Sequence, residues 1–342
     1  MTIEEVESLL ASTNDPKVIF GSSDPKKTFR SLISVVHPDH NDNNPLSVRL
    51  FKEINRLWDV KDAPLPTIKS PKRTYTIGKL IASGDVADIY HAEGASTSTI
   101  GMMPLTNKYV LKISRIVNGH TLLDNEQKIL TKFSLDARAS AYSLLLPKLA
   151  ESFLAKDKIQ KRVNVFVFED GLYSVDEVLK AHPIIDPRHL VWLFKRILMI
   201  IGFAHKHGIV HSAVLPEHVR IVPVNHGLQL IGWGHAVDTG GVVKTISAKY
   251  RAWYPPEVLK KQTVSAATDI FMAAKTMIYL AGGDPISNRM PDSVPSNMQR
   301  FLKSCTLEGQ NMRPDNAWTL HDEFSDLAKL LYGPPKFVNL EM

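Results

Sequence analysis

Four histidines close together in the sequence are the first residues whose type could do chemistry. His205, His207, His211 and His218 carry imidazoles, which are common protein ligands of zinc. His205 and His207 are two positions apart, so on a helix they point to different faces. The four also lack the spacing of a closed zinc site. We therefore predict no metal site here and keep zinc as a minor alternative.

A second group of chemically active residues, His37-Pro38-Asp39, lies between two segments with helical periodicity. Asp24-Pro25 and Asn44-Pro45 each place a capping residue before a proline at the first helical position. The apolar residues that follow recur at helical spacing: Phe29, Leu32, Ile33 and Val36, and then Leu50, Phe51, Ile54, Leu57 and Trp58. The pattern predicts two antiparallel helices joined by a short polar loop.

The stretch from Asp24 to Trp58 resembles a J-domain, in which a His-Pro-Asp loop joins two antiparallel helices. The match includes the run 51–55 in the second helix, although His40 stands where a lysine is usual. The resemblance implies docking on a DnaK-type heat-shock chaperone and stimulation of its ATP hydrolysis. The chaperone-binding residues that it implies are His37, Pro38, Asp39, Lys26, Lys27 and Arg30. Basic residues on one helical face can steer a protein onto an acidic partner, which fits this interpretation.

The chain changes character after this hairpin. Residues 62–73 contain Pro64, Pro66 and Pro71, and closely spaced prolines block both a helix and a central strand. We predict a semi-extended linker there. Strand-like runs follow and then long helical stretches, among them an apolar helix over residues 187–207 that we expect in the core.

From Tyr75 to about residue 333 the chain resembles a protein kinase, because segments typical of that family occur in the family's order. Residues 80–90 stand at the glycine-rich loop, where only Gly84 of three glycines is kept. Lys112 and Glu126 match the lysine and glutamate whose ion pair positions the lysine on nucleotide phosphates. The resemblance makes Gly84, Lys112 and Glu126 the candidate nucleotide-binding residues. Equally, Lys112 and Glu126 could serve only to lock the helix against the sheet.

The residues that carry the chemistry in this family are replaced. Where the family has His-Arg-Asp-Leu-Lys-Pro-Glu-Asn, residues 211–218 are His-Ser-Ala-Val-Leu-Pro-Glu-His. Ala213 replaces the catalytic aspartate, Leu215 the lysine and His218 the magnesium-binding asparagine. Gly232 replaces the aspartate of the Asp-Phe-Gly segment. Magnesium prefers oxygen ligands, and loss of a general base costs roughly 10²–10⁴-fold in rate. We therefore expect no catalytic residue at these four positions.

Three residues with structural roles in the family are kept. Glu257 lies in a Tyr-Pro-Pro-Glu run, and Arg313 stands where the family's arginine pairs with that glutamate. Asp269 matches the aspartate that supports the backbone of the catalytic loop. The residues that hold the fold are retained while those that do the chemistry are changed, so the resemblance implies a pseudokinase.

The composition of the chain bears on its domain number, its compartment and its classes of partner. The chain has 342 residues, 44% of them hydrophobic, which suffices for about two domains. A single cysteine, Cys305, cannot form an intramolecular disulfide and fits a reducing compartment. The N-terminus lacks the basic region of a secretory signal, and charged residues interrupt the most apolar stretch, residues 190–204. The net charge of +6 is scattered without a nucleic-acid motif. We expect an intracellular, cytoplasmic protein with no membrane or nucleic-acid partner.

These observations predict a multidomain chain. A small all-α J-domain-like helical hairpin over residues 1–61 precedes the linker over 62–73 and a bilobal α+β protein-kinase-like fold over 74–333. The small lobe ends at about residue 170, the large lobe starts at about 171, and residues 334–342 form a tail.

The leading functional hypothesis is a co-chaperone adaptor whose kinase-like domain binds an unknown client. One alternative is an atypical protein kinase or nucleotide-transferring enzyme with a rebuilt ATP site, for which Asp85 is the one unusual carboxylate. Another is an oligomerisation platform. No cofactor is certain, and ATP without magnesium is left open.

Overall fold

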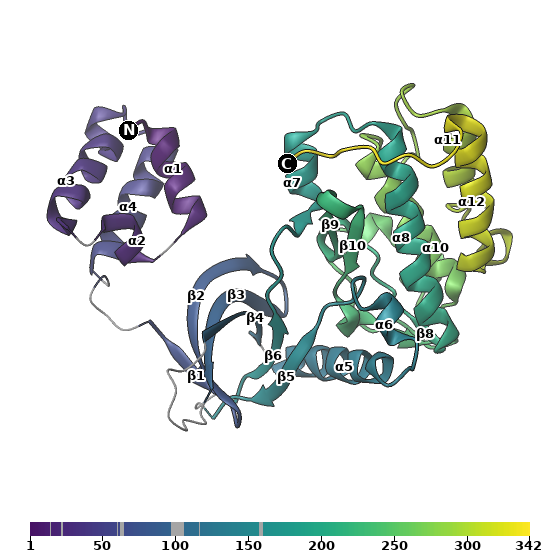
Figure 1. Ribbon diagram of the computed structural model, residues 1–342, viewed down its shortest axis with the longest axis horizontal. Coiled ribbons are helices and arrows are strands. Elements are labelled where there is room, and N and C mark those ends of the chain that lie inside the picture. Colours follow the sequence, from purple (N-terminus) through teal and green to yellow (C-terminus); the bar gives the residue numbers. More distant parts are fainter. Residues whose placement is uncertain are drawn as a thin grey trace. The chain divides into compact units, whose positions relative to one another are not determined.

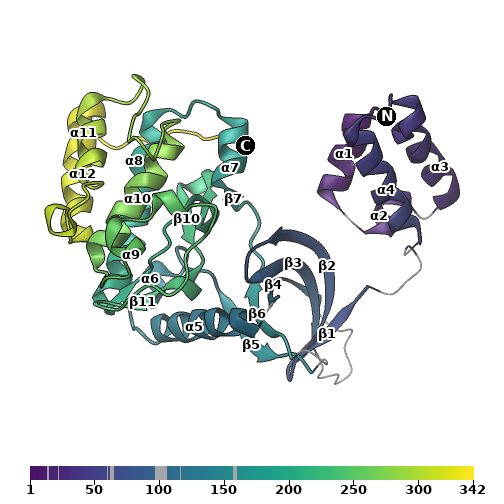
Figure 2. The same ribbon diagram turned by 180° about the vertical axis from the view of Figure 1, so that it is seen from behind.

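The computed structural model describes residues 1–13, 15–21, 23–59, 61, 65–96, 106–115, 117–156 and 160–342. The chain divides into two compact units. The first contains residues 1–115 and 153–168, and the second contains residues 116–152 and 169–342. The elements of each unit can be followed in Figure 1 and from behind in Figure 2.

The chain begins with a helical region of four α-helices. These are α1 (Ile3–Ser12), α2 (Pro16–Phe20), α3 (Pro25–Val36) and α4 (Pro45–Asp59), with a short 3₁₀ turn, η1 (Pro38–His40). The segment before α3 forms two helices, α1 and α2. Thr2 and Glu5 form a capping box that starts α1, and Asp15 caps α2, which has Pro16 at its first position. Because proline cannot continue a helix, the segment restarts there.

The predicted helical pair α3 and α4 is confirmed. The Asp24 side chain accepts a hydrogen bond from the Lys27 amide at 3.0 Å, and Asn44 accepts one from the Ser47 amide at 2.8 Å. The apolar stripes of both helices enter one core with α1 and α2. Its buried members are Val6, Ile19, Phe20, Leu32, Val36, Leu50, Ile54 and Leu57. Phe29 and Trp58 stack at its margin with ring centroids 4.3 Å apart.

A six-stranded sheet follows. Its strands are β1 (Thr67–Lys69), β2 (Arg73–Ser83), β3 (Ala87–Ser96), β4 (Thr106–Ser114), β5 (Leu149–Leu154) and β6 (Arg162–Val167), in the order β1-β2-β3-β4-β6-β5. The stretch that we expected to be linker throughout therefore contains a strand, β1, which pairs with β2 from Thr67 opposite Thr76. Pro66 and Pro71 flank this edge strand instead of interrupting it, so no ladder hydrogen bond is lost. Pro64 lies outside the described residues.

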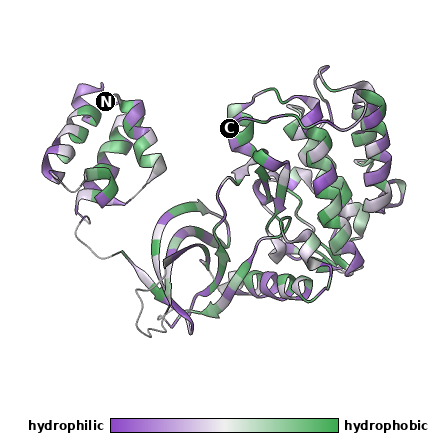
Figure 3. Ribbon diagram, viewed as in Figure 1, coloured by the Kyte–Doolittle hydropathy of each residue, from purple (hydrophilic) through white to green (hydrophobic). Residues whose placement is uncertain are grey.

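The second unit is mainly helical. Its α-helices are α5 (Val117–Ser134), α6 (Ala139–Tyr142), α7 (Val175–Ala181), α8 (Pro187–Lys206), α9 (Pro256–Leu259), α10 (Ala266–Leu280), α11 (Ser296–Ser304) and α12 (Ala317–Tyr332). The predicted core helix is confirmed as α8, and Figure 3 shows hydrophobic residues along α8 and α10. Asp186 caps α8 and Pro187 stands at its first position.

Short strands and 3₁₀ turns complete this unit. The strands are β7 (Tyr173–Ser174), β8 (Ile209–Val210), β9 (Val219–Val222), β10 (Gly227–Leu230) and β11 (Val237–Asp238). They form a sheet in the order β10-β9-β7 and a separate pair, β11-β8. The 3₁₀ turns of this unit include η2 (Pro216–His218) and η4 (Trp233–His235).

Helix α5 lies in a different unit from the lobe to which we assigned it. We placed it in a small lobe ending at about residue 170, but it clusters with the second unit. The Asn125 amide group donates hydrogen bonds to the carbonyls of Gly234 at 3.0 Å and Ala236 at 2.8 Å. The ring of Phe133 also meets Trp233 edge-on, with centroids 5.0 Å apart. These contacts bind α5 to the segment around η4. Among the described residues, no helix has the length and apolarity needed to cross a membrane.

Candidate functional site

The site begins with the buried loop that leads from β8 to η2. Ala213 and Leu215, which replace a carboxylate and a lysine of the kinase pattern, are both completely buried. Their side chains contribute only apolar atoms to this loop. The loop therefore offers neither a base nor a cation at these two positions.

The other two replaced positions meet in space. Gly232 has φ +86°, and a Cβ atom added to it would lie 2.6 Å from Cδ2 of His218 and 2.7 Å from its Nε2. His218 is held in this place because its Nδ1 donates a hydrogen bond of 2.7 Å to the carbonyl of Ala213. Ala213, His218 and Gly232 thus form one contact group, in which the imidazole fills the space that a larger residue at 232 would need.

This contact group does not fit a magnesium ion. Magnesium requires near-octahedral oxygen coordination, usually from carboxylates, and neither Ala213 nor Gly232 carries a side-chain oxygen. In the part of the chain that the structure describes, no three His, Cys, Asp or Glu side chains are placed to hold a metal ion. The histidines considered for zinc turn to different partners. His205 Nε2 forms a hydrogen bond of 2.9 Å with the Asp269 carboxylate, and His207 Nε2 forms one of 2.9 Å with the Asp136 carboxylate.

An aromatic residue fills the space beside the group. Trp233 is completely buried, and its Nε1 donates a hydrogen bond of 2.8 Å to the carbonyl of Leu230. Its ring meets His211 edge-on at 4.6 Å. Burial lowers the pKa of His211 to about 4, and the nearby Asp269 only partly opposes this effect. His211 is therefore neutral at physiological pH, with Nε2 donating to the carbonyl of Ile231 at 3.0 Å.

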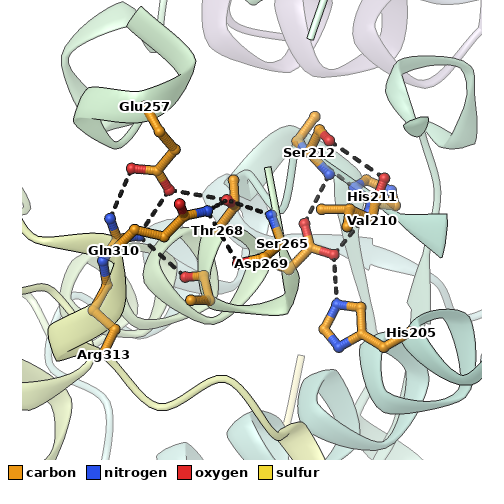
Figure 4. A network of polar contacts seen from close by, with 12 residues as sticks. His205, Val210, His211, Ser212, Glu257, Ser265, Thr268, Asp269, Gln310 and Arg313 are labelled. Carbon is orange, nitrogen blue, oxygen red and sulfur yellow. Dashed lines mark hydrogen bonds and ion pairs between the residues drawn. The ribbon is translucent and has the colours of Figure 1, made fainter. Parts of the chain in front are cut away.

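Asp269 of α10 supports the backbone of the loop between β8 and η2 (Figure 4). Its carboxylate, which is completely buried, accepts hydrogen bonds of 2.7 Å from the amides of His211 and Ser212. His205 donates to the same carboxylate. Ser212 has φ +62°, a conformation that costs a non-glycine residue energy and persists only where its surroundings fix it. Asp269 has the supporting position that the sequence predicted for it.

The second retained group joins α9 to the segment before α12 (Figure 4). Arg313 and Glu257 form a paired contact, Nη1 to Oε1 at 2.9 Å and Nη2 to Oε2 at 2.7 Å. Both residues are buried, and the Thr268 hydroxyl donates to Glu257 at 2.9 Å. Bidentate arginine–carboxylate pairs are stronger and more specific than single ionic contacts. The ion pair predicted from the sequence is present.

The candidate nucleotide-binding residues lie in different units. Gly84 is in the turn between β2 and β3, where its amide donates to the carbonyl of Ala87 at 3.0 Å. Lys112 is on β4 and faces Asn164 in the ladder with β6, while Glu126 is buried on α5 of the second unit. Their predicted ion pair stays a prediction.

Arg115 also belongs to this region, although no sequence pattern had indicated it. Its Nη1 donates to the carbonyl of Gly84 at 3.1 Å and to the hydroxyl of Ser83 at 3.3 Å. It also lies 3.7 Å from the Asp88 carboxylate. These contacts tie the glycine-containing turn to the end of β4. An exposed arginine after a strand is too common a pattern to have indicated this role.

The His-Pro-Asp loop is internally fastened. Nδ1 of His37 accepts a hydrogen bond from the Asp39 amide at 3.2 Å, and the Asp39 carboxylate is exposed. Asn41, which the sequence did not indicate, donates to the carbonyls of Val35 and His37, both at 2.9 Å. The basic residues of α3, Lys26, Lys27 and Arg30, are all exposed. The loop is thus fixed while the charged groups around it remain accessible.

Comparison with known proteins assigns the larger part of the chain. Residues 75–333 match the protein kinase domain. The serine/threonine-protein kinase GE16371 of Drosophila yakuba is 21% identical over 273 residues, which are 77% of this chain and 33% of that protein. PknB of Mycolicibacterium smegmatis is 29% identical over 126 residues, or 35% of this chain and 20% of that kinase. The probable serine/threonine-protein kinase FMP48 of Saccharomyces cerevisiae is 24% identical over 170 residues, or 48% and 42%.

The matching segment spans about a third of the length of the Drosophila kinases. The family match begins after the N-terminal helices and ends where α12 ends. It covers well over half of the sequence, so the chain belongs to the protein kinase domain family.

Proposed function

We propose that this kinase domain does not transfer phosphoryl groups by the magnesium-dependent route and acts instead as a protein-binding module. The observation that carries the proposal is the His218 imidazole, which lies where a side chain at position 232 would have to lie. A carboxylate could not be added at 232 without moving this ring. The aspartate of the kinase pattern is therefore absent at position 232, and the His218 ring also occupies the space that its side chain would need.

The chemical consequence follows from how phosphoryl transfer is catalysed. The reaction depends on positioning and on neutralising charge, with metal ions bridging the β- and γ-phosphates. Loss of the base at Ala213 alone would cost roughly 10²–10⁴-fold in rate. Loss of the metal site adds to this cost, because nothing then supplies the Lewis acid. The groups that remain, Asp269 and the Glu257–Arg313 pair, stabilise the fold and face its interior.

For the N-terminal helices we propose recruitment of a DnaK-type chaperone. The support is a fastened loop with an exposed carboxylate at Asp39, next to a helix with three exposed cations. Charge complementarity of this kind increases the association rate with an acidic partner and fixes its orientation. In this proposal the chaperone acts on a client, still unidentified, that is held by the kinase domain.

Single-turnover ATP hydrolysis by a DnaK-type chaperone from the same host tests this second part. We expect the full chain to accelerate hydrolysis and His37→Gln to abolish the acceleration. His40→Gln is the matched control, because His40 is exposed and also lies in the loop. Equal stimulation by all three proteins, or none by the full chain, would remove the chaperone part of the proposal.

A second candidate function is an atypical protein kinase or nucleotide-transferring enzyme. The comparisons favour it more directly than the co-chaperone proposal, because the relatives are named serine/threonine-protein kinases and the family match leaves out the N-terminal helices. Lys112 and Glu126, which the kinase pattern requires, are present. Incubation with radiolabelled ATP and either magnesium or manganese tests it. Labelled product that disappears with Lys112→Met would establish this function and overturn the non-catalytic proposal.

A further inference from the structure

The second unit contains a hollow away from the candidate site. It has a volume of about 610 Å³ and lies between α8, α12 and the chain that follows α12. Small-molecule sites have volumes of roughly 300–1,000 Å³, so its size suits a ligand of that class. None of Gly84, Lys112 and Glu126 lines it, so it is distinct from the candidate nucleotide site.

The lining of the hollow is strongly basic. Its cations are Arg188, Lys195, Arg196, Lys329 and Lys336, and its one carboxylate is Asp326. Arg188 is already paired with Asp186 at 2.5 Å. Lys195, Lys329 and Lys336 form no ion pair or side-chain hydrogen bond with any residue that the structure describes. Three ammonium groups without a carboxylate partner line the same hollow, and an anion bound among them would be attracted by all three.

The wall formed by the last residues of the chain is fixed in place. The His226 ring stacks on Trp192 of α8 at 4.5 Å and on Phe337 at 4.1 Å. Nε2 of the same histidine donates a hydrogen bond of 2.6 Å to the carbonyl of Val338. Figure 1 shows this segment, in yellow, running from α12 past α8 towards α7. These contacts fix the backbone next to Lys336 at the wall of the hollow.

We propose that this hollow is a binding site for a small, multiply phosphorylated molecule. Lysine ammonium groups act as compact charges that suit phosphate oxygens. Three such groups, with a single carboxylate to oppose them, favour a ligand that carries more than one negative charge. The site would give the kinase domain a ligand-dependent function that needs no phosphoryl transfer.

Calorimetric titration of the full chain with inositol hexakisphosphate and with pyrophosphate, at physiological salt, tests the proposal. We expect the wild type to bind at least one of these probes. Changing Lys195, Lys329 and Lys336 together to glutamine should weaken binding about 10- to 100-fold, since each lost charge removes an attractive contact.

The matched control changes Lys244, Lys260 and Lys303 to glutamine, because these lysines are exposed on the same unit and the net charge falls equally. It should bind like the wild type. Melting curves of every variant show that the fold is kept. No binding by the wild type at millimolar probe would overturn the proposal, as would equal affinity in the two triple variants. Binding only to vesicles that carry phosphorylated headgroups would overturn the assignment to a free small molecule.

Discussion

Two groups in the second unit come from the same kinase pattern and differ in outcome. The Glu257–Arg313 pair and Asp269 keep the family's residue types and make the expected contacts. Ala213, His218 and Gly232 have lost those types, yet they also form a close-packed arrangement with a hydrogen bond of its own. Both groups are closely packed, and only the first keeps the residue types of the kinase pattern.

The difference shows which residue types the packing of this domain constrains. A buried arginine or carboxylate cannot lose its partner cheaply, because the remaining charge has no solvent. The replaced positions carried groups that interact with a ligand in active kinases. Their loss leaves no buried charge, and the neutral imidazole of His218 fills the space. The scaffold residues are therefore constrained by packing, whether or not the domain is catalytic.

The largest expected effect is on the retained pair. Arg313→Ala should lower the free energy of unfolding by about 3–5 kcal/mol, because Glu257 would remain buried and charged. Denaturant unfolding measures this. Arg300→Ala, at an exposed position of α11, is the control and should change stability by no more than about 0.5 kcal/mol. Similar losses for both variants would contradict a special role of the buried pair.

A pH titration tests how much stability the buried His211 contributes. Burial holds its pKa at about 4, compared with 6.5 for an unperturbed histidine. Between these values the unfolded chain binds a proton that the folded chain does not. The stability that His211 contributes is therefore fully present above pH 6.5 and declines as the pH falls towards 4, by about 3 kcal/mol.

Unfolding free energies measured from pH 7.5 to 4 should show this decline. In His211→Gln the decline over that range should be smaller, while His321→Gln on α12 should keep it. An unchanged pH dependence in His211→Gln would show that other groups are responsible.

Restoring an acidic residue examines the replaced group directly. Gly232→Asp should cost about 2–3 kcal/mol, because the new Cβ would collide with the His218 ring in addition to having a positive φ. Gly240→Asp is a matched control, since Gly240 has φ +80° and open space around its Cβ position. His218→Ala in the Gly232→Asp background should recover part of the loss. If the double-mutant cycle gives no coupling, the ring does not occupy the space of that side chain.

The smallest effect should come from the contact of α5 with the segment around η4. Asn125→Ala removes two hydrogen bonds to the carbonyls of Gly234 and Ala236 and should cost about 1–2 kcal/mol. Lys128→Ala, exposed on the same helix, should be nearly neutral. Thermal unfolding of both variants distinguishes them, and an equal, small shift would show that α5 is held by packing alone.

Much of the fold could be predicted from the sequence because its signals are local. Asp24-Pro25 and Asn44-Pro45 set the starts of α3 and α4, and the apolar spacing identified α8 as core. Such signals depend on capping and periodicity, which act within a few residues. The same locality explains the errors. Pro66 and Pro71 resemble linker prolines in a short window, and the pairing of β1 with β2 depends on residues further along the chain.

The sequence by itself determined which residue types are available: an intact His-Pro-Asp segment, a retained Glu257, Asp269 and Arg313, and no carboxylate at 213 or 232. Only the tertiary structure decided what fills the space at 232, that α5 is bound to the segment around η4, and that Lys195, Lys329 and Lys336 line one hollow. These relations join residues far apart in the chain. They depend on how helices pack, and no local pattern of residues encodes that packing.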